Sequence, residues 1–237
     1  MTMTGEEYVN QIKADIAAKH ANLNHPFCRL LIEGKLTRTQ LQGWARQRFK
    51  GISGMDLGEV AQLYVKAPDE QIRRHVLELL GEESGSLSGK SHKEMFLDFC
   101  QAIGISREEV FAAPVLPETL AVANLYKVRF LHDSFLEGLM SMACVESQNP
   151  DGFAQWAPAL EKHYGLARKH LGWFLEHVAA DSTEDGHGGA AFEIVKKYAV
   201  TDEVQQRVRR AVGETLSSYW MMFDGIYRVY VEGKAAA

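Results

Sequence analysis

Hydrophobic residues recur at helical spacing along almost the whole chain, and the strict alternation typical of strands is rare. Thr4 with Glu7, and Thr37 with Gln40, carry the capping-box pattern that begins helices. A short helix is expected after Ser106. The other predicted helices cover residues 4–20, 27–32, 37–67 (with a bend at Gly51 and Gly54), 70–80, 91–104, 118–148, 151–163, 165–181, 188–199 and 202–232. The pattern therefore predicts an all-α fold, a helical bundle that forms a single domain over residues 1–237.

Composition excludes several classes of protein. The 237 residues are 46% hydrophobic and 24% charged, which is ordinary for a folded globular chain. The net charge is −5, so basic residues are not in excess and we expect no nucleic-acid partner. No apolar run reaches the roughly 18 residues that cross a bilayer, and the 3 cysteines show no paired spacing. We therefore expect a cytoplasmic protein without a membrane partner, whose 9 histidines need an explanation.

A carboxylate lies on an apolar stripe of the predicted helix over 118–148. Phe135, Leu139 and Met142 form the stripe, and Glu146 follows on the same face at about 100° per residue. Burying a bare charge costs several kcal/mol, roughly, so such a carboxylate needs a partner. A position at the helix end, where Glu146 would reach water, remains the alternative.

A second stripe, on the predicted helix over 165–181, consists of His170, Phe174, His177 and Asp181. His177 and Asp181 lie four residues apart, so one helix face can present an imidazole and a carboxylate to one metal ion. A surface pair with a small stabilising effect is the alternative.

Other candidate donors lie near predicted helix ends. Glu82 and Glu83 end one helix, and His92 begins the next across a Gly/Ser-rich loop. His187 follows Asp181 after an acidic segment that contains Glu184. Mixed nitrogen and oxygen donors of this kind suit iron or manganese, and the absence of thiolates disfavours zinc and iron–sulfur sites. The candidate ligands are Glu82, His92, Glu146, His177, Asp181 and His187.

The sequence resembles a known superfamily from about His25 to Tyr230. The segments that carry the resemblance are HPFCRLLIEGKLTRTQLQGWARQRF, PDEQIRRHVLELL, VLPET, EKHYG and SYWMMFDGIY. They are similar to the superfamily of PQQ synthase (PqqC), TenA and CADD-like proteins. This resemblance implies a heme-oxygenase-like all-α fold and a homodimer. Its PQQ-synthase branch uses no metal, whereas its CADD-like branch resembles non-heme diiron oxidases and oxygenases.

The resemblance also implies a ligand set. The segments GEESG and SH carry Glu82 and His92, ESQNP carries Glu146, HVAAD carries His177 and Asp181, and GHGG carries His187. The gaps before His92 and before His187 are longer than usual in the CADD-like branch, so Glu83 and Glu184 are alternatives. Arg48 matches a basic position that binds substrate carboxylates in the PQQ-synthase branch; a solvated arginine is the alternative.

Some family activities are disfavoured by individual residues. Cys28 stands where the CADD-like proteins that make 4-aminobenzoate have a tyrosine that they consume, and Trp156 stands where they have a lysine. A TenA-type thiaminase needs a nucleophilic cysteine on the middle helix, and Cys144 lies nearby. A cysteine at such a position is more often a small core residue.

Taken together, these features predict a non-heme diiron enzyme, with two Fe ions and with Mn as a possible replacement. It would use O2 to oxidise a small organic metabolite, carboxylated or amino-acid-like, bound by Arg48. The first alternative is a cofactor-free oxidase like PQQ synthase, with His92, His177 and His187 as acid–base groups. A TenA-like protein without redox activity and a non-catalytic interaction protein are the others.

Overall fold

The structure is a computed structural model that describes residues 2–87, 89–181 and 187–234, with the side chains of residues 180, 181, 187 and 188 outside the described part. Within these ranges every regular element is a helix, so the predicted all-α fold is confirmed. The N-terminal elements are α1 (Gly5–Ala18), α2 (Ala21–Asn24), α3 (Pro26–Ile32), α4 (Arg38–Arg48), the π-helix η1 (Phe49–Ser53), α5 (Leu57–Val60), α6 (Gln62–Lys66) and α7 (Glu70–Ser84). The remaining elements are α8 (His92–Ala102), α9 (Arg107–Ala112), α10 (Pro117–Leu131), α11 (Phe135–Glu146), α12 (Asn149–Tyr164), the 3-10 helix η2 (Arg168–His170), α13 (Gly172–Asp181), α14 (His187–Tyr198), α15 (Asp202–Ile226) and the π-helix η3 (Tyr227–Val231).

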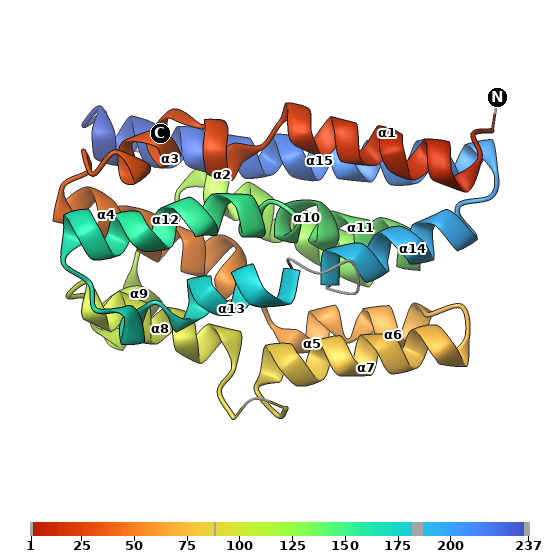
Figure 1. Ribbon diagram of the computed structural model, residues 1–237, viewed down its shortest axis with the longest axis horizontal. Helices are drawn as coiled ribbons and strands as arrows, with labels where there is room; N and C mark the ends of the chain where they lie inside the picture. Colours follow the sequence, from red (N-terminus) through yellow and green to blue (C-terminus); the bar gives the residue numbers. More distant parts are fainter. Residues whose placement is uncertain (1, 88, 182–186, 235–237) are drawn as a thin grey trace.

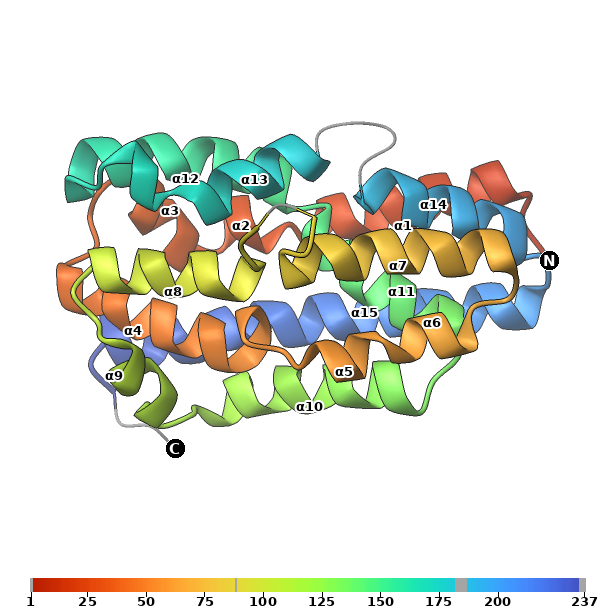
Figure 2. The same ribbon diagram turned by 90° about the horizontal axis from the view of Figure 1, so that it is seen from below.

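The helices run mainly along the long axis of the molecule. α1 and α15, from opposite ends of the chain, lie side by side at the top of Figure 1, and α5 to α9 lie on the opposite side. Seen from below, α8 and α7 follow one another nearly end to end (Figure 2), and α13 packs against α8. This arrangement brings residues from distant parts of the sequence to the middle of the bundle.

Local sequence signals account for most helix starts. The capping boxes at Thr4 and Thr37 are present, and each satisfies backbone N–H groups at the start of α1 and α4. The expected bend at Gly51 and Gly54 is also present, because α4 continues into the π-helix η1 and ends there. Single π-turns of this kind often accompany functional sites.

The prediction of one long helix over residues 118–148 is wrong. The chain turns after Leu131, and α11 begins at Phe135 with a capping box between Ser134 and Glu137. Lys66 donates hydrogen bonds from its ammonium group to two carbonyl oxygens at this turn, those of Phe130 and Asp133, at 2.7 and 2.8 Å. The S-x-x-E signature that begins α11 was present in the sequence and is stronger than the continuous hydrophobic pattern.

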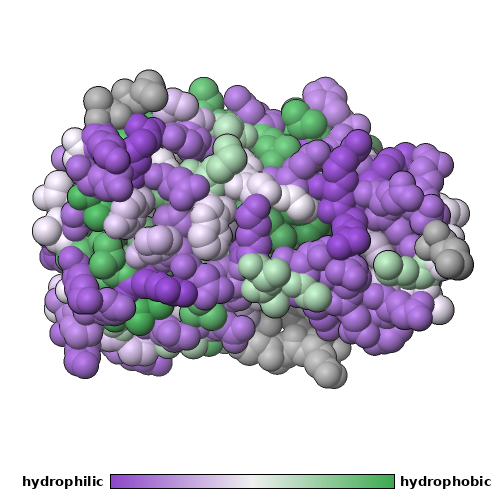
Figure 3. All heavy atoms as spheres, turned by 90° about the horizontal axis from the view of Figure 1, so that it is seen from above, coloured by the Kyte–Doolittle hydropathy of each residue, from purple (hydrophilic) through white to green (hydrophobic). Residues whose placement is uncertain are grey.

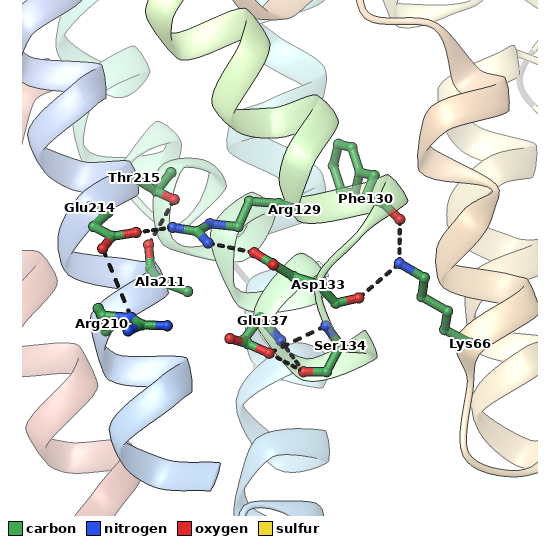
Figure 4. A network of polar contacts seen from close by, with 10 residues as sticks. All are labelled: Lys66, Arg129, Phe130, Asp133, Ser134, Glu137, Arg210, Ala211, Glu214 and Thr215. Carbon is green, nitrogen blue, oxygen red and sulfur yellow. Dashed lines mark hydrogen bonds and ion pairs between the residues drawn. The ribbon is translucent and has the colours of Figure 1, made fainter. Parts of the chain in front are cut away.

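A buried arginine fastens this turn to α15. Arg129 has 5% of its surface exposed and forms ion pairs with Asp133 at the turn and with Glu214 on α15 (Figure 4). Arg210, which is exposed, reaches Glu214 from the other side. The network connects α10, α11 and α15 through charge-assisted hydrogen bonds.

The predicted stripe that begins at His170 is shortened by the structure. His170 belongs to η2, and α13 begins only at Gly172. Phe174 and His177 remain on one face of α13, but His170 is not part of that face. The core around Phe174 is rich in aromatic rings, including Trp44 and Trp156, whose ring centroids are 5.3 Å apart.

Buried hydrophobic residues from nearly every helix form one connected core. On the face over α1 and α15, polar side chains cover most of the surface and apolar groups occur in small, separate patches (Figure 3). No described helix is both long and apolar enough to cross a bilayer.

Candidate metal and substrate cavity

A cavity of about 260 Å³ lies in the middle of the bundle, where α4 and η1 meet α7, α8 and α11–α13. One part of its lining is apolar, as is usual for small-molecule sites. The apolar and aromatic residues are Ile52, Met55, Leu57, Val60, Tyr126, Met142, Val145 and Trp173. Polar groups converge on the same space; they are Arg48, Ser53, Glu83, Ser84, Ser91, His92, Lys93, Glu146 and Asn149, together with His177.

The loop between α7 and α8 brings a carboxylate and an imidazole together. Gly85 ends α7 in the left-handed conformation, with φ of 75°. Ser91 then caps α8, its Oγ accepting a hydrogen bond from the backbone N–H of Glu94. As a result His92 Nδ1 lies 2.8 Å from Glu83 Oε1, and the His92 side chain is almost fully buried.

His177 reaches the cavity from α13. Its ring centroid lies 4.5 Å from that of His92, and its Nδ1–H donates a hydrogen bond to the Trp173 carbonyl oxygen at 2.7 Å. Burial, and then the neighbouring His92, lower the pKa of His177 to about 3. The ring is therefore neutral at physiological pH, with its proton on Nδ1 and the lone pair of Nε2 available to a ligand.

Glu146 comes to the cavity from a third direction, at the end of α11. Its side chain is half-buried and lines the cavity together with Val145 and Met142 from the same helix. The alternative of a fully solvated carboxylate does not fit this position. The structure therefore brings Glu83, His92, Glu146 and His177 to one cavity.

The other predicted ligands are Glu82, Asp181 and His187, and the structure does not place their side chains at the cavity. Glu82 precedes Glu83 by one residue, which rotates it by about 100° around α7, and it is not among the cavity-lining residues. Glu83, the alternative, takes that position. α13 ends at Asp181 and α14 begins at His187, but their side chains lie outside the described part of the structure, as does all of Glu184.

Side chains in the described ranges do not by themselves form a group of three or more His, Cys, Asp or Glu residues that is close enough to hold a metal ion. The chemistry of the four donors at the cavity nevertheless fits iron, which accepts imidazole nitrogen and carboxylate oxygen. A ligating histidine usually donates its second N–H to a backbone carbonyl or a carboxylate, and His177 has such a partner in the Trp173 carbonyl oxygen.

Of the described residues that line the cavity, Arg48 and Lys93 are cationic, and Arg48 is the more buried of the two. Only 4% of its surface is exposed, so the alternative of a solvated arginine is wrong. Its Nε donates to Ser53 Oγ at 3.1 Å, its Nη1 donates to the Tyr219 hydroxyl at 3.0 Å, and its guanidinium lies 5.4 Å from the Trp173 ring centroid. Among the described residues no carboxylate pairs with it, although buried arginines normally have one.

The cysteines lie away from this chemistry. Cys144 is fully buried, its Sγ lies 3.3 Å from the Ser141 carbonyl oxygen, and burial raises the pKa of its thiol, so that it is not a thiolate nucleophile. Cys28 is also fully buried. Neither Cys28 nor Trp156 is among the residues that line the cavity.

Ser53, Tyr126 and Asn149 are among the cavity residues that were not predicted from the sequence. Asn149 is part of the ESQNP segment, in which only Glu146 was predicted as a site residue. Its position before Pro150, at the start of α12, was the available signal. Ser53 and Tyr126 had no signal of their own, because only the π-helix and the packing of α10 turn them to the cavity.

Comparison with known proteins places this geometry in context. A protein-family model described as "Iron-containing redox enzyme" matches residues 57–220. The 4-aminobenzoate synthase of Nitrosomonas europaea is 30% identical over 239 residues, covering 96% of this chain and 94% of that protein. The pyrroloquinoline-quinone synthase of Xanthomonas campestris is 28% identical, covering 94% of this chain and 89% of that protein.

Solved structures show the same fold at much lower identity. A TenA homologue from Pseudomonas syringae has a TM-score of 0.79 at 16% identity and covers 93% of both chains. A domain of unknown function with a heme oxygenase-like fold, from Shewanella denitrificans, has a TM-score of 0.73 at 16% identity and covers 98% of this chain and 94% of that one. The chain therefore has a heme-oxygenase-like fold.

Proposed function

The chain belongs to the iron-containing redox enzyme family, and on that premise we propose that it is a non-heme diiron oxidase or oxygenase. In this proposal, it uses O2 to oxidise a small carboxylated metabolite inside the central cavity. Two related proteins are named for the products that they make, 4-aminobenzoate and pyrroloquinoline quinone. The support for a metal enzyme comes from the donor groups of this chain.

The observation that carries the proposal is the environment of His177. Its Nδ1–H donates to the Trp173 carbonyl oxygen, and its pKa is about 3, so Nε2 presents a lone pair in the cavity at any physiological pH. His92 lies beside it with Nδ1 paired to Glu83. His177, held in this way next to carboxylates, suits a metal ligand better than a general base, because burial keeps its pKa well below 7.

We assign the iron ligands to Glu83, His92, Glu146 and His177, with Asp181 and His187 completing the set as the sequence predicts. Iron bound there would supply the redox chemistry that lets O2 react with a substrate. The apolar wall of Met142, Val145 and neighbouring residues excludes water and positions the substrate next to these ligands.

Arg48 binds the substrate carboxylate in this proposal. It is buried, lines the cavity, and has no carboxylate partner within the described ranges, so an anionic substrate would compensate its charge. Trp173 stacks against the guanidinium and holds it in place.

We do not propose 4-aminobenzoate as the product, although a relative of that name is 30% identical. Cys28 and Trp156 replace the tyrosine and lysine that the resemblance associates with that reaction. Both are fully buried outside the cavity lining, and Trp156 Nε1 donates to the Asn22 carbonyl oxygen at 2.8 Å. Neither side chain is placed to take part in chemistry there.

Metal analysis tests the proposal. Protein purified from iron-supplemented cells should contain iron when it is analysed by inductively coupled plasma mass spectrometry. The His177→Ala variant should contain much less iron than wild type. His132→Ala, at an exposed histidine after α10, is the matched control and should keep it. Equal iron in His177→Ala and wild type would contradict the ligand assignment. Turnover that survives full removal of metal by a chelator would favour a cofactor-free oxidase instead.

A further inference from the structure

A chain of hydrogen bonds between buried side chains connects two points of the cavity wall. Arg48 Nη1 donates to the Tyr219 hydroxyl at 3.0 Å, and that hydroxyl donates to Asn22 Oδ1 at 2.7 Å. Asn22 Nδ2 then donates to Asn149 Oδ1 at 3.3 Å. Each of these four side chains is at most 4% exposed, and the residues at both ends, Arg48 and Asn149, line the cavity.

The direction of this chain is determined by Arg48. A guanidinium has donors only, so the Tyr219 oxygen must accept from it, and the single phenolic proton must go to Asn22. Asn22 therefore turns its carbonyl oxygen to Tyr219 and its NH2 group to Asn149. Asn149 can accept that bond only through Oδ1, which leaves its own NH2 group as the part that faces the cavity.

Both ends of the chain thus offer donors without acceptors. Arg48 Nη2 and Asn149 Nδ2 make no hydrogen bond within the described part of the structure. Ser53, which also lines the cavity, accepts from Arg48 Nε, so its hydroxyl proton is also available. Neither Arg48 Nη2 nor Asn149 Nδ2 is among the buried polar atoms of the described residues that lack a partner, so both are open to water in the cavity. A ligand that displaces this water without offering an acceptor leaves a donor unsatisfied at a cost of roughly 1–3 kcal/mol, so these donors favour a group that brings acceptors only.

We propose that Asn149 is a second substrate-binding residue, which shares the substrate carboxylate with Arg48, and that Tyr219 and Asn22 are positioning residues that hold its NH2 group toward the cavity. The two oxygens of a carboxylate accept from both donors, whereas the neutral amide of the same shape would place its own NH2 against one of them. This series of hydrogen bonds therefore makes the cavity select a carboxylate over the corresponding amide. This inference rests on the proposed function in one respect: it requires that the substrate binds in this cavity.

Binding of benzoate and benzamide to the metal-free protein, measured by calorimetry, tests this selectivity. Wild type should bind benzoate at least about tenfold more tightly than benzamide, a difference of about 1.4 kcal/mol. Asn149→Asp keeps the oxygen that accepts from Asn22 and replaces only the NH2 group by oxygen, so benzoate binding should weaken at least about tenfold. Asn124→Asp, which adds the same charge at an exposed position of α10, should bind like wild type.

Tyr219→Phe tests the positioning role separately. Without the phenol oxygen, Asn22 is oriented, apart from its bond to Asn149, only by the long bond from its Nδ2 to the Gln148 carbonyl oxygen, at 3.4 Å. Asn149 can then turn more readily, so the ratio of benzoate affinity to benzamide affinity should fall. Unchanged benzoate binding in Asn149→Asp, or an unchanged preference in Tyr219→Phe, would overturn the proposal. So would a wild-type protein that does not bind benzoate. Because metal is absent from these measurements, iron content determined in parallel separates failure of the iron assignment from failure of this one.

Discussion

Replacement of Gly85 by alanine should distort the loop that joins α7 to α8 and brings Glu83 and His92 to the cavity. Gly85 has φ of 75°, a conformation that costs an L-residue about 1–2 kcal/mol. An added Cβ would also lie 2.3 Å from the backbone carbon of Lys90 and 2.3 Å from the backbone nitrogen of Ser91. Backbone atoms cannot move aside as a flexible side chain does, so the loop must open. We expect the free energy of unfolding to fall by about 3–5 kcal/mol in Gly85→Ala.

Gly165→Ala is the matched control for this change. Gly165 ends α12 in the same left-handed conformation, with φ of 69°, but an added Cβ would meet nothing within 4 Å. Its loss of stability should be only about 1–2 kcal/mol, the backbone strain alone. Urea unfolding of both variants measures the difference. Gly85→Ala should also bind less iron at temperatures where it is folded, because an opened loop separates His92 from Glu83. Equal destabilisation of the two variants would refute the steric argument.

Two further predictions concern buried charge. Unfolded His177 has a pKa near 6.5 and folded His177 one of about 3, so between these values only the unfolded chain takes up this proton. The metal-free protein should therefore lose stability as pH falls from about 6.5 towards 3, by up to about 1.4 kcal/mol per unit, and His177→Gln should show a shallower dependence in pH-dependent urea unfolding; parallel profiles would contradict this. Arg129→Met should lower the free energy of unfolding by about 1.5–3 kcal/mol, because it removes the charge-assisted hydrogen bonds that the buried guanidinium makes to Asp133 and Glu214. Arg210→Met, at an exposed pair with Glu214, should change it by less than about 0.5 kcal/mol, and similar effects of the two variants in thermal unfolding would show that the network of Figure 4 is not stabilising.

Local signals in the sequence predicted much of the fold. Thr4 and Thr37 mark helix starts because a capping box is satisfied within four residues, without help from the rest of the chain. The same capping box is present at Ser134, where it begins α11 and separates it from α10 although hydrophobic residues recur at helical spacing through both. The end of α7 was harder to predict, because the helix continues to Ser84 and ends only where Gly85 can turn back on Lys90 and Ser91.

Some residues of the candidate site could likewise be predicted from the sequence, and others could not. His92, Glu146 and His177 could be proposed from the sequence, since residue type, spacing and resemblance point to the same positions. The choice between Glu82 and Glu83 could not, because neighbouring helix positions differ by about 100° and only the packing of α7 against α8 decides which faces the cavity. The direction of the Asn149 amide also depends on tertiary structure, because Arg48, Tyr219 and Asn22 meet only when α4, α15 and α2 pack together. The sequence by itself thus determined an all-helical chain and the residue types of a candidate iron site. The tertiary structure decided which of those side chains are desolvated together, and desolvation determines their charge, tautomer and hydrogen-bond direction.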